Sequence, residues 1–319
     1  MKEVAVGIDI GGTFTKYGIV DKEGNCLING SISTTREKEL DGFLKVLKST
    51  IDKAATSIKE AIEIKGIGAG APNGNFYKGT IEYAPNLSWK GIVPFIDEFK
   101  KHYDLPMFLT NDANAAAIGE MVYGSAKHMK NFIIITLGTG LGSGLVVNGE
   151  LVYGHDGFAG ELGHLTIVPG GRMCATGRRG SMETYVSAPG IRRTVFELLA
   201  DSLEESEFRD VTFNQLTAKM ISDAAKKGDK IALQAFELTG KYLGEALADT
   251  VAHTSPEAIF LFGGLANAGQ LIIEPTKRHM ESNLLKIFQN KVKILPSGLT
   301  ETNAAVMGAS ALVWKELGN

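Results

Sequence analysis

The sequence predicts an α/β protein of two lobes, and three observations carry this prediction. The chain has 319 residues, more than one compact core usually supports. Short apolar runs rich in β-branched residues are interspersed with segments whose apolar residues recur at helical spacing. A layout of strand, glycine turn, strand, short turn and strand occurs near residue 4 and again near residue 132. We interpret this repeat as a structural duplication, with one copy in each lobe.

The first copy begins with a short apolar strand, Val4 to Ile10. A tight turn at Gly11-Gly12-Thr13 leads into a strand from Lys16 to Val20, and a turn over Asp21 to Asn25 leads into a third strand, Cys26 to Thr34. These connections are too short for parallel crossovers, so we expect an antiparallel meander.

A helix and two strands are predicted next. Apolar residues from Leu40 to Ile62 recur every three or four positions, which predicts an amphipathic helix of about six turns. Ile64 to Ala69 and Met107 to Thr110 are predicted strands. Asn111-Asp112 then precedes an apolar helical run that continues to about Tyr123, and Asn or Asp is the expected N-cap of such a helix.

The second copy has the same order of elements. Phe132 to Leu137 is a predicted strand, Gly138 to Gly144 a glycine-rich turn, and Leu145 to Asn148 the returning strand, followed by a turn at Gly149 and a strand from Glu150 to Tyr153. The remaining predictions are a helix over Ile231–His253, a strand over Ala258–Phe262, a helix over Leu271–Gln289, a strand over Val292–Leu295 and a terminal helix over Asn303–Leu317. No Ser/Pro-rich linker separates the lobes, so we expect a hinge between packed elements.

Composition restricts the function classes. The net charge is -3, which gives no general affinity for nucleic acid. The two cysteines, Cys26 and Cys174, are far apart and indicate a reducing compartment. No run of about 18 apolar residues predicts a membrane span, and the start of the chain lacks a signal-peptide pattern. We therefore expect a soluble cytoplasmic protein that binds neither nucleic acid nor membranes.

Two glycine turns at strand ends suggest a site for a polyphosphate. Backbone N–H groups in Gly11-Gly12-Thr13 and Gly138-Thr139-Gly140 can point at phosphate oxygens, and the two threonines can add hydroxyl donors. Either turn alone is more readily interpreted as a hairpin. The matching pair, together with Asp9, favours nucleotide binding. The sequence contains no P-loop motif, and no G-x-G-x-x-G precedes a helix, so a P-loop and a Rossmann site are both unsupported.

Three polar positions are candidates for acid–base chemistry and sugar binding. Asp112 follows a strand and precedes a helix, where a carboxylate could accept the proton of an attacking hydroxyl; plain N-capping explains it equally well. Glu161 and His164 follow a glycine-rich segment and could converge on one polyol, although a surface glutamate with a satisfied histidine is the more ordinary interpretation. The glycine-rich, basic stretch from Gly170 to Glu183 predicts only a loop.

Taken together, these segments resemble the ROK family (repressors, open reading frames and sugar kinases). Each match is weak alone, but all occur in the family's order and span nearly the whole chain. The matching stretches are Asp9-Ile10-Gly11-Gly12-Thr13 with Lys16, Asn111-Asp112-Ala113-Asn114-Ala115, Leu137-Gly138-Thr139-Gly140, Glu161-Leu162-Gly163-His164, Glu183 and Gly263-Gly264.

The resemblance implies an actin-like, ribonuclease-H-like ATPase fold with a cleft between two lobes. It places residues 1–111 and about 301–319 in a small N-terminal lobe and 112–300 in a large C-terminal lobe. It implies ATP and Mg²⁺ as cofactors and Asp112 as the general base. Sugar contacts would come from Asn86, Asn111, Asp112, Glu161, His164 and Glu183. Nucleotide contacts would come from Asp9 (near Mg²⁺), Gly11, Gly12, Thr13, Lys16, Gly138, Thr139, Gly140, Gly263 and Gly264.

The sequence departs from the family pattern in two places. Asn73 stands where the family usually has glycine, which affects the local backbone at the sugar entrance. The family also typically holds a structural zinc with the histidine matching His164 and three cysteines. Here Cys174 is retained, but Thr176 and Ser181 occupy the other two positions. Hydroxyls are poor zinc ligands compared with thiolates, so we predict that zinc is absent. We expect a Thr176 or Ser181 hydroxyl, or a backbone carbonyl, to orient His164 instead.

These features predict a hexose kinase of the glucokinase type, because Asn86, in Pro85-Asn86-Leu87 with Trp89, matches a sugar-contacting stretch of the family's glucokinases. N-acetylmannosamine, N-acetylglucosamine and fructose stay open as substrates. A DNA-binding repressor is disfavoured because Asp9 stands too close to Met1 for a preceding domain. A catalytically silent sugar sensor and an acyl-phosphate kinase are further rivals. Dimers are common in the family, so a homodimer is an open expectation.

Overall fold

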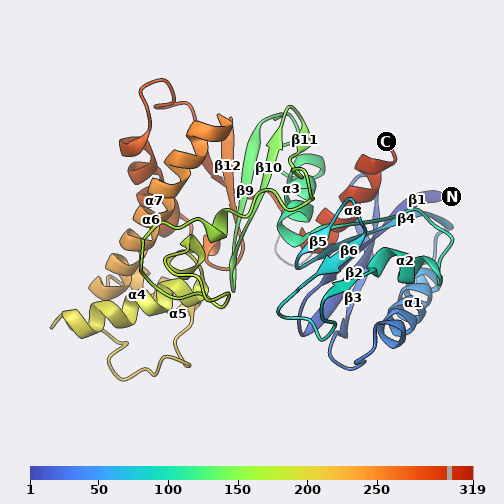
Figure 1. Ribbon diagram of the computed structural model, residues 1–319, viewed down its shortest axis with the longest axis horizontal. Helices are drawn as coiled ribbons and strands as arrows, with labels where there is room; N and C mark the ends of the chain where they lie inside the picture. Colours follow the sequence, from blue (N-terminus) through green and yellow to red (C-terminus); the bar gives the residue numbers. More distant parts are fainter. Residues whose placement is uncertain (300–303, 319) are drawn as a thin grey trace.

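Two five-stranded sheets with one topology form the framework of the protein (Figure 1). The computed structural model describes residues 1–299 and 304–318. The N-terminal sheet has the order β3 (Cys26–Ser33), β2 (Phe14–Asp21), β1 (Lys2–Ile10), β4 (Ile62–Ala71) and β8 (Met107–Asn111). The C-terminal sheet has the order β11 (Glu150–Leu151), β10 (Leu141–Val147), β9 (Phe132–Leu137), β12 (Ala258–Phe262) and β13 (Lys293–Pro296).

The pairing within each sheet confirms the duplication predicted from the sequence. The first three strands of each set form an antiparallel meander. The last two strands run parallel to the first strand of their set. Parallel strands end at the same edge of a sheet, so the residues that follow β1, β4 and β8 meet at one edge, and those that follow β9 and β12 meet at another.

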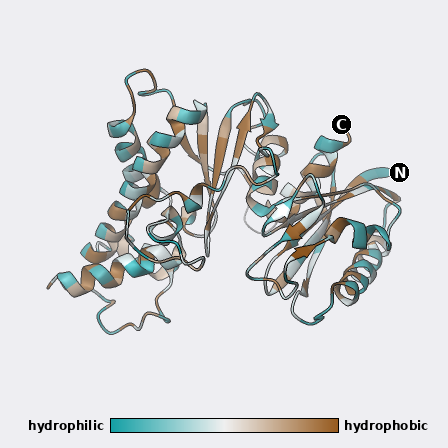
Figure 2. Cartoon of the chain, in the orientation of Figure 1, coloured by the Kyte–Doolittle hydropathy of each residue, from teal (hydrophilic) through white to brown (hydrophobic). Residues whose placement is uncertain are grey.

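The N-terminal sheet is covered by α1 (Leu40–Ser57), whose apolar side chains Phe43, Leu44, Leu47 and Ile51 are buried in the same cluster as Val6 and Ile8 of β1. A small third sheet of β5 (Gly74–Asn75), β6 (Thr80–Glu82) and β7 (Ile92–Val93), with α2 (Phe95–Lys100), completes this part of the molecule. In Figure 2, hydrophobic residues colour the strands, whereas the outward side of α1 is hydrophilic.

The C-terminal sheet packs against a helical layer (Figure 1). This layer consists of α4 (Ala188–Asp201), α5 (Ala218–Lys226), α6 (Lys230–Thr254) and α7 (Gln270–Asn283), with single turns of 3₁₀-helix at η1 (Leu162–His164), η2 (Met182–Thr184) and η3 (Ala266–Ala268). In the part of the chain that the structure describes, no helix is long and apolar enough to cross a membrane.

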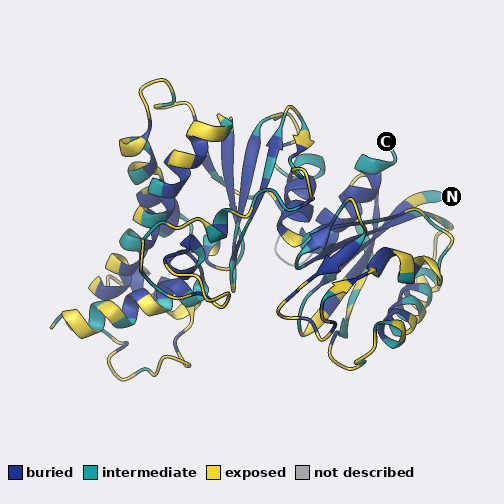
Figure 3. Cartoon of the chain, viewed as in Figure 1, coloured by how far each residue is buried: buried dark blue, intermediate teal, exposed yellow. Residues whose placement is uncertain are grey.

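Two helices, α3 (Asp112–Val122) and α8 (Ala304–Glu316), lie between the sheets, and their facing sides are buried (Figure 3). The helix α8 packs on β1 and β4, and α3 packs on α8 and on β10. The packing on β1 is close: a Cβ atom at Gly7 would lie 2.0 Å from the carbonyl oxygen of Val306. Only glycine allows this approach.

Several predicted boundaries need correction. The first helix ends at Ser57, because Ile58 has an extended backbone (φ -73°, ψ 124°), and Ile62 belongs to β4. The helix predicted to reach Gln289 ends at Asn283, where Leu284 turns to an extended conformation. The start of the terminal helix at Asn303 and the segment 301–303 lie outside the described residues, as does Asn319.

The second glycine turn is shorter than predicted. It covers Gly138 to Gly140, and β10 begins at Leu141, so Gly142 and Gly144 belong to the strand. Close packing requires glycine at both positions. A Cβ atom at Gly142 would lie 2.9 Å from the Cβ of Ala113, and one at Gly144 would lie 2.6 Å from the Cβ of Ala117. Glycines in this strand therefore serve the close contact with α3.

Candidate active site

The predicted phosphate-binding turns lie at the ends of equivalent strands. Gly11 to Thr13 follow β1, and Gly138 to Gly140 follow β9. In the first turn, the Gly11 N–H donates to the carbonyl of Phe14 at 3.1 Å. In the second, the Gly138 N–H donates to the carbonyl of Gly140 at 3.0 Å. Thr13 and Thr139 are both exposed.

The first turn lies directly against the segment of Asn86. A Cβ atom at Gly12 would approach the carbonyl oxygen of Asn86 to 2.7 Å. Lys16 pairs with Asp9 in the register of β1 and β2 and is exposed. The structure thus brings Asp9, Gly12, Lys16 and Asn86 together at one edge of the N-terminal sheet.

The second turn lies beside Gly263 and Gly264, which follow β12. The N–H of Leu265 donates to the carbonyl of Leu137 at 3.1 Å, and Gly263 has a left-handed backbone (φ 98°) that favours glycine. A Cβ atom at Gly138 or at Gly264 would meet nothing within 4 Å. The surface over these glycines is therefore open, as close approach of a ligand to the backbone requires.

Asn111 and Asp112 have separate roles at the start of α3. The Asn111 side chain caps the helix by accepting the N–H of Ala113 at 2.8 Å. Asp112 is the first residue of the helix, and its Oδ1 also accepts this N–H at 2.8 Å. Because Asn111 already serves as the N-cap, capping alone does not explain the presence of Asp112. The side chain is open to solvent, yet the surrounding protein removes much of its hydration, and this desolvation raises the pKa of Asp112.

Asp9, the last polar residue of β1, lies close enough to Asp112 for their charges to interact. Burial, and then repulsion by Asp112, raise the pKa of Asp9 to about 6, against the attraction of Lys16. A cation between these carboxylates would relieve the repulsion.

The predicted sugar-binding residues of the C-terminal part also come together. The Nε2 of His164 lies 3.8 Å from Oε2 of Glu161, and Glu183 Oε2 accepts the N–H of Leu141 at 3.3 Å. Desolvation raises the pKa of Glu161; His164 opposes the rise, and the negative charges of Asp112 and Glu183 add to it. Glu161 is thus close enough to Asp112, at the start of α3, and to Glu183 for their charges to interact.

Two residues that support this site were not predicted. The Arg172 guanidinium donates to the carbonyls of Thr184 and Gly190 at 2.9 and 3.1 Å and lies over the Tyr185 ring, which holds η2 and Glu183 in place. Ser143 accepts the Leu162 N–H at 3.2 Å and donates to the Gly160 carbonyl, on either side of Glu161. Arg172 had no sequence signal beyond its place in a basic loop, and Ser143 had no signal at all.

The side chains at the zinc positions do not fit that metal. The Cys174 sulfur and Thr176 Oγ1 are 2.9 Å apart and share a hydrogen bond. The Ser181 hydroxyl faces the same thiol without forming a hydrogen bond, and it and Nδ1 of His164 are both buried without a partner. One thiol, one imidazole and two neutral hydroxyls do not make a zinc site.

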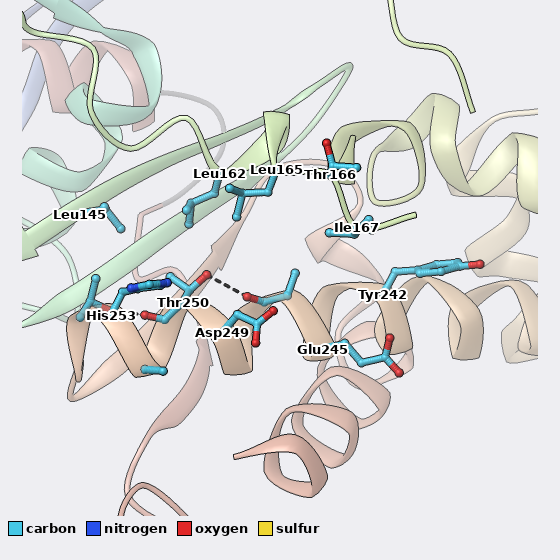
Figure 4. Close-up of a pocket in the computed structure, with 13 residues that line it drawn as sticks. Leu145, Leu162, Leu165, Thr166, Ile167, Tyr242, Glu245, Asp249, Thr250 and His253 are labelled. Atoms are coloured by element: carbon cyan, nitrogen blue, oxygen red, sulfur yellow. Dashed lines mark hydrogen bonds between the residues drawn. The ribbon is translucent and has the colours of Figure 1, made fainter. Parts of the chain in front are cut away.

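A groove of about 670 Å³ lies behind this site, between the segment of Leu162, Leu165 and Ile167 and the helix α6 (Figure 4). Figure 4 shows Glu245, Asp249 and His253 along the helical side. None of the predicted site residues lines this groove. The predicted site lies instead along the strand ends.

The duplicated sheets define the two-lobed actin-like ATPase fold. The chain belongs to the ROK family, whose sequence model matches residues 5–316. A glucokinase of Halalkalibacterium halodurans is 36% identical over 284 residues, 88% of this chain and 86% of the relative. A ROK family glucokinase of Streptomyces griseus, solved with glucose and AMPPNP, superposes with a TM-score of 0.79 at 30% identity, covering 97% of this chain and 98% of that one.

Regulators also occur among the relatives. The xylose repressor of Bacillus subtilis is 29% identical over 312 residues, which are 97% of this chain but 76% of the repressor. A solved ROK family transcriptional regulator superposes with a TM-score of 0.88 at 26% identity, covering 99% of this chain and 79% of that one. The ROK family thus includes both kinases and regulators, and the chemistry of the candidate site is what distinguishes them.

Proposed function

We propose that the protein is an ATP-dependent hexose kinase that transfers the γ-phosphoryl group of ATP to the C6 hydroxyl of glucose. The observation that carries the proposal is Asp112, a solvent-accessible carboxylate with a raised pKa whose position as helix cap is already filled by Asn111. A base of this kind is what phosphoryl transfer to a hydroxyl requires. Similarity to glucokinases over most of the chain supports glucose as the substrate.

The sugar lies between the two lobes in this proposal. Asn86 and Asn111 contact it from the N-terminal lobe, and Asp112, Glu161, His164 and Glu183 contact it from the C-terminal lobe. Carboxylates, amides and an imidazole supply both donors and acceptors, which suits a neutral polyol. Because Asn111 uses its side-chain oxygen to cap α3, its amide N–H₂ is the group left for a sugar hydroxyl.

ATP binds along the opposing glycine turns. We assign its phosphates to Gly11, Gly12, Thr13 and Lys16 on one side and to the turn Gly138-Thr139-Gly140 on the other, with the adenosine against Gly263 and Gly264. Support comes from the unobstructed surface over Gly138 and Gly264. Backbone N–H donors and the Lys16 ammonium would stabilise the charge that develops on the transferred group.

Mg²⁺ fits beside Asp9. Burial is the main cause of the raised pKa of Asp9, and repulsion by Asp112 adds to it; a cation there would relieve this repulsion. Asp9 would hold the ion through water. When bound, Mg²⁺ supplies charge neutralisation for the phosphates.

The chemical step uses Asp112. The C6 oxygen attacks the γ-phosphorus, the bond from that phosphorus to the oxygen it shares with the β-phosphate breaks, and ADP leaves with the electron pair. The hydroxyl proton passes to Asp112, whose raised pKa makes it a stronger base than an ordinary aspartate. Closure of the lobes around the sugar would exclude water, which otherwise competes as the acceptor.

The proposal is tested with an ADP-release assay in the presence of ATP and Mg²⁺. The panel contains glucose, mannose, fructose, N-acetylglucosamine and N-acetylmannosamine. We expect the highest kcat/KM with glucose. Higher turnover with an N-acetylhexosamine or with fructose would keep the kinase and replace the substrate.

A non-catalytic sugar-sensing regulator is the second candidate, because repressors match 97% of this chain. Sugar binding by calorimetry without turnover on any member of the panel would favour it. We further propose a division into residues 1–111 with about 301–319 and residues 112–300, a cytoplasmic location and a homodimer. The sparse cysteines support the location, and sedimentation analysis tests the dimer.

A further inference from the structure

Glu120 is a buried carboxylate that the proposed mechanism does not use. It lies on α3, its side chain is 0% exposed, and no cation among the described residues forms an ion pair with it. A buried carboxylate without a cation is uncommon and needs hydrogen-bond donors from elsewhere. The identity of these donors indicates what the residue does.

The donors to Glu120 come from two separate stretches of chain. Oε1 accepts the backbone N–H of Ser125 at 2.7 Å and that of Gly298 at 3.0 Å. Oε2 accepts the hydroxyl of Ser297 at 2.5 Å. The N–H of Ser297 in turn donates to the carbonyl of Leu261 in β12 at 2.9 Å, which fixes this stretch to the C-terminal sheet.

These two stretches are the places where the chain crosses between the sheets. The helix α3 follows β8 of the N-terminal sheet and precedes β9 of the C-terminal sheet, and Ser297–Gly298 follows β13 on the way back to α8. Figure 1 shows α3 and α8 between the lobes. Glu120 therefore joins the outgoing crossing to the returning one.

The crossings are packed too closely for sliding. A Cβ atom at Gly298 would lie 2.3 Å from the Ser125 hydroxyl oxygen, and one at Gly119 would lie 2.8 Å from the Cα of Gly308 in α8. A rotation of the lobes must therefore pivot about this contact, and Glu120 provides its polar part.

We propose that Glu120 is a positioning residue, which pins the two crossings together and thereby holds Asp112 in line with the phosphoryl donor. Asp112 starts the same helix, two turns or about 12 Å before Glu120. A rigid helix transmits a tilt at one end to the other, so loss of the pin displaces Asp112 relative to the turn at Gly138. The inference rests on the proposed kinase function.

The test compares three variants that differ in what remains of the pin. Glu120→Ala removes the acceptor. Glu120→Gln keeps an oxygen for the N–H groups of Ser125 and Gly298, and its amide can donate to the Ser297 hydroxyl. Ser297→Ala removes one bond from the returning crossing and covers the case in which Glu120→Ala does not fold.

Asp21 offers a matched control. Its carboxylate is 1% exposed and accepts the N–H of Asn25 at 2.7 Å, but it caps a turn at the far end of β2. Asp21→Ala therefore removes an equally buried carboxylate whose side-chain partners, Asn25 and Lys2, lie in neither crossing. The backbone carbonyl of Asp21, which accepts the Tyr123 hydroxyl at 3.5 Å, is kept in this variant. Variants are compared as kcat per folded molecule, with glucose Kd from calorimetry and amide hydrogen exchange in α3.

We expect Glu120→Ala to lower kcat at least about tenfold, since displacement of a reacting group by about 1 Å costs up to about a hundredfold. Glucose Kd should change less than kcat does, because Asn86, Glu161, His164 and Glu183 stay in place and only the contacts at the start of α3 move. Glu120→Gln should recover kcat to within about threefold, Ser297→Ala should lower it in the same direction, and Asp21→Ala should lower only the thermal midpoint.

Equal kcat for Glu120→Ala and Asp21→Ala would overturn the inference and leave Glu120 a structural anchor. A wild-type protein without turnover would instead refute the kinase proposal. Hydrogen exchange then tests the positioning role of Glu120 without reference to turnover. Faster exchange at the Ala113 amide in Glu120→Ala than in Asp21→Ala supports this role, and equal exchange overturns it.

Discussion

Neighbouring residues with similar side chains can have different roles, as Asn111 and Asp112 do. Asn111 has the extended backbone of an N-cap (φ -65°, ψ 151°), whereas Asp112 already belongs to the helix. The cap is therefore complete without the carboxylate. This separation makes the role of Asp112 testable without loss of the helix.

Asp112→Asn should lower kcat by about 10²–10⁴-fold, because an amide cannot accept the proton from the sugar hydroxyl. Glucose Kd should change little, since size and polarity are kept. Thermal unfolding serves as the check on folding, because Asn111 still accepts the N–H of Ala113. Near-normal turnover of a folded variant would rule out Asp112 as the base.

Asp9 makes stability depend on pH. In the folded protein its pKa is about 6, above the ordinary 3.8, so the folded state binds the additional proton between these values. Stability consequently falls as pH rises from about 4 to about 6 and then stays at the lower level. Ionisation of Asp9 thus lowers the free energy of unfolding by at most about 3 kcal/mol.

Asp9→Asn should therefore raise the thermal midpoint at pH 8 and leave it nearly unchanged near pH 4. The measurement is calorimetric unfolding of both proteins across this range without nucleotide. Asp210→Asn, at an exposed position, is the control. A gain that is the same at both pH values would mean that Asp9 is not the group responsible.

Asn73 shows what a residue-level prediction can and cannot say. The sequence marked it as a departure from glycine and implied a changed backbone. In the structure Asn73 has a left-handed conformation (φ 51°), and its amide donates to the carbonyl of Glu82 at 2.9 Å. Glycine and Asn both adopt this region more readily than other residues, so Asn73 suits the backbone found here.

At the scale of elements, the second glycine turn lies between the proposed nucleotide and sugar sites. A Cβ atom at Gly140 would lie 2.5 Å from Oε2 of Glu183, whereas one at Gly138 would meet nothing within 4 Å. The two glycines of one turn thus face different partners.

Gly140→Ala should displace Glu183 and raise the KM for glucose more than that for ATP. Gly138→Ala should act on ATP, because its added methyl projects from the open surface of the turn. Steady-state kinetics with each substrate varied separately distinguish the two effects. The assignment fails if both variants change the same KM.

The loop after η1 carries the departure from the zinc-binding pattern. We predict that the wild-type protein holds less than about 0.1 zinc per chain, and that Thr176→Cys/Ser181→Cys holds about one, since three thiolates and the free Nδ1 of His164 would form a tetrahedral set. Metal analysis after dialysis gives the answer, with Thr176→Cys alone as the control. One zinc per wild-type chain would contradict this.

The elements that the sequence predicted well are short, almost continuously apolar runs bounded by polar residues or glycine. Phe132–Leu137 and Ala258–Phe262 match β9 and β12 to the residue. The overextended first helix arose because Ile58 and Ile62 continue the helical spacing by chance, although the chain has turned to an extended conformation at Ile58. Tertiary contacts determine where a helix ends, and the spacing of apolar residues in the sequence does not contain this information.

The residues that support the site could not be predicted from the sequence for a related reason. Arg172, Ser143 and Glu120 act through partners that are far away in the chain, such as Glu120 with Ser297, 177 positions apart. No local pattern records such pairs. The resemblance to a family supplied the residues that would touch ligands, and the fold supplied those that hold them.

At the scale of the whole molecule, the proposed sugar site requires both lobes to reach one small ring. In the proposed division, Asn86 and Asn111 belong to the N-terminal lobe, and Asp112, Glu161 and Glu183 belong to the C-terminal lobe. A ligand that contacts both sides favours the closed arrangement by the free energy of the contacts formed only there. Glucose should therefore shift the molecule toward closure even without nucleotide.

We predict that saturating glucose lowers the radius of gyration measured by small-angle X-ray scattering, and that AMP-PNP with Mg²⁺ lowers it further. The physical reason is that each ligand has contacts from both lobes, so closure buries them between protein surfaces. Glu161→Gln/Glu183→Gln is the control, because it weakens the contacts of one lobe and should need more glucose for the same change. If calorimetry shows glucose bound while the radius stays constant, the two lobes do not close on the sugar, and water exclusion during phosphoryl transfer must then come from the nucleotide alone.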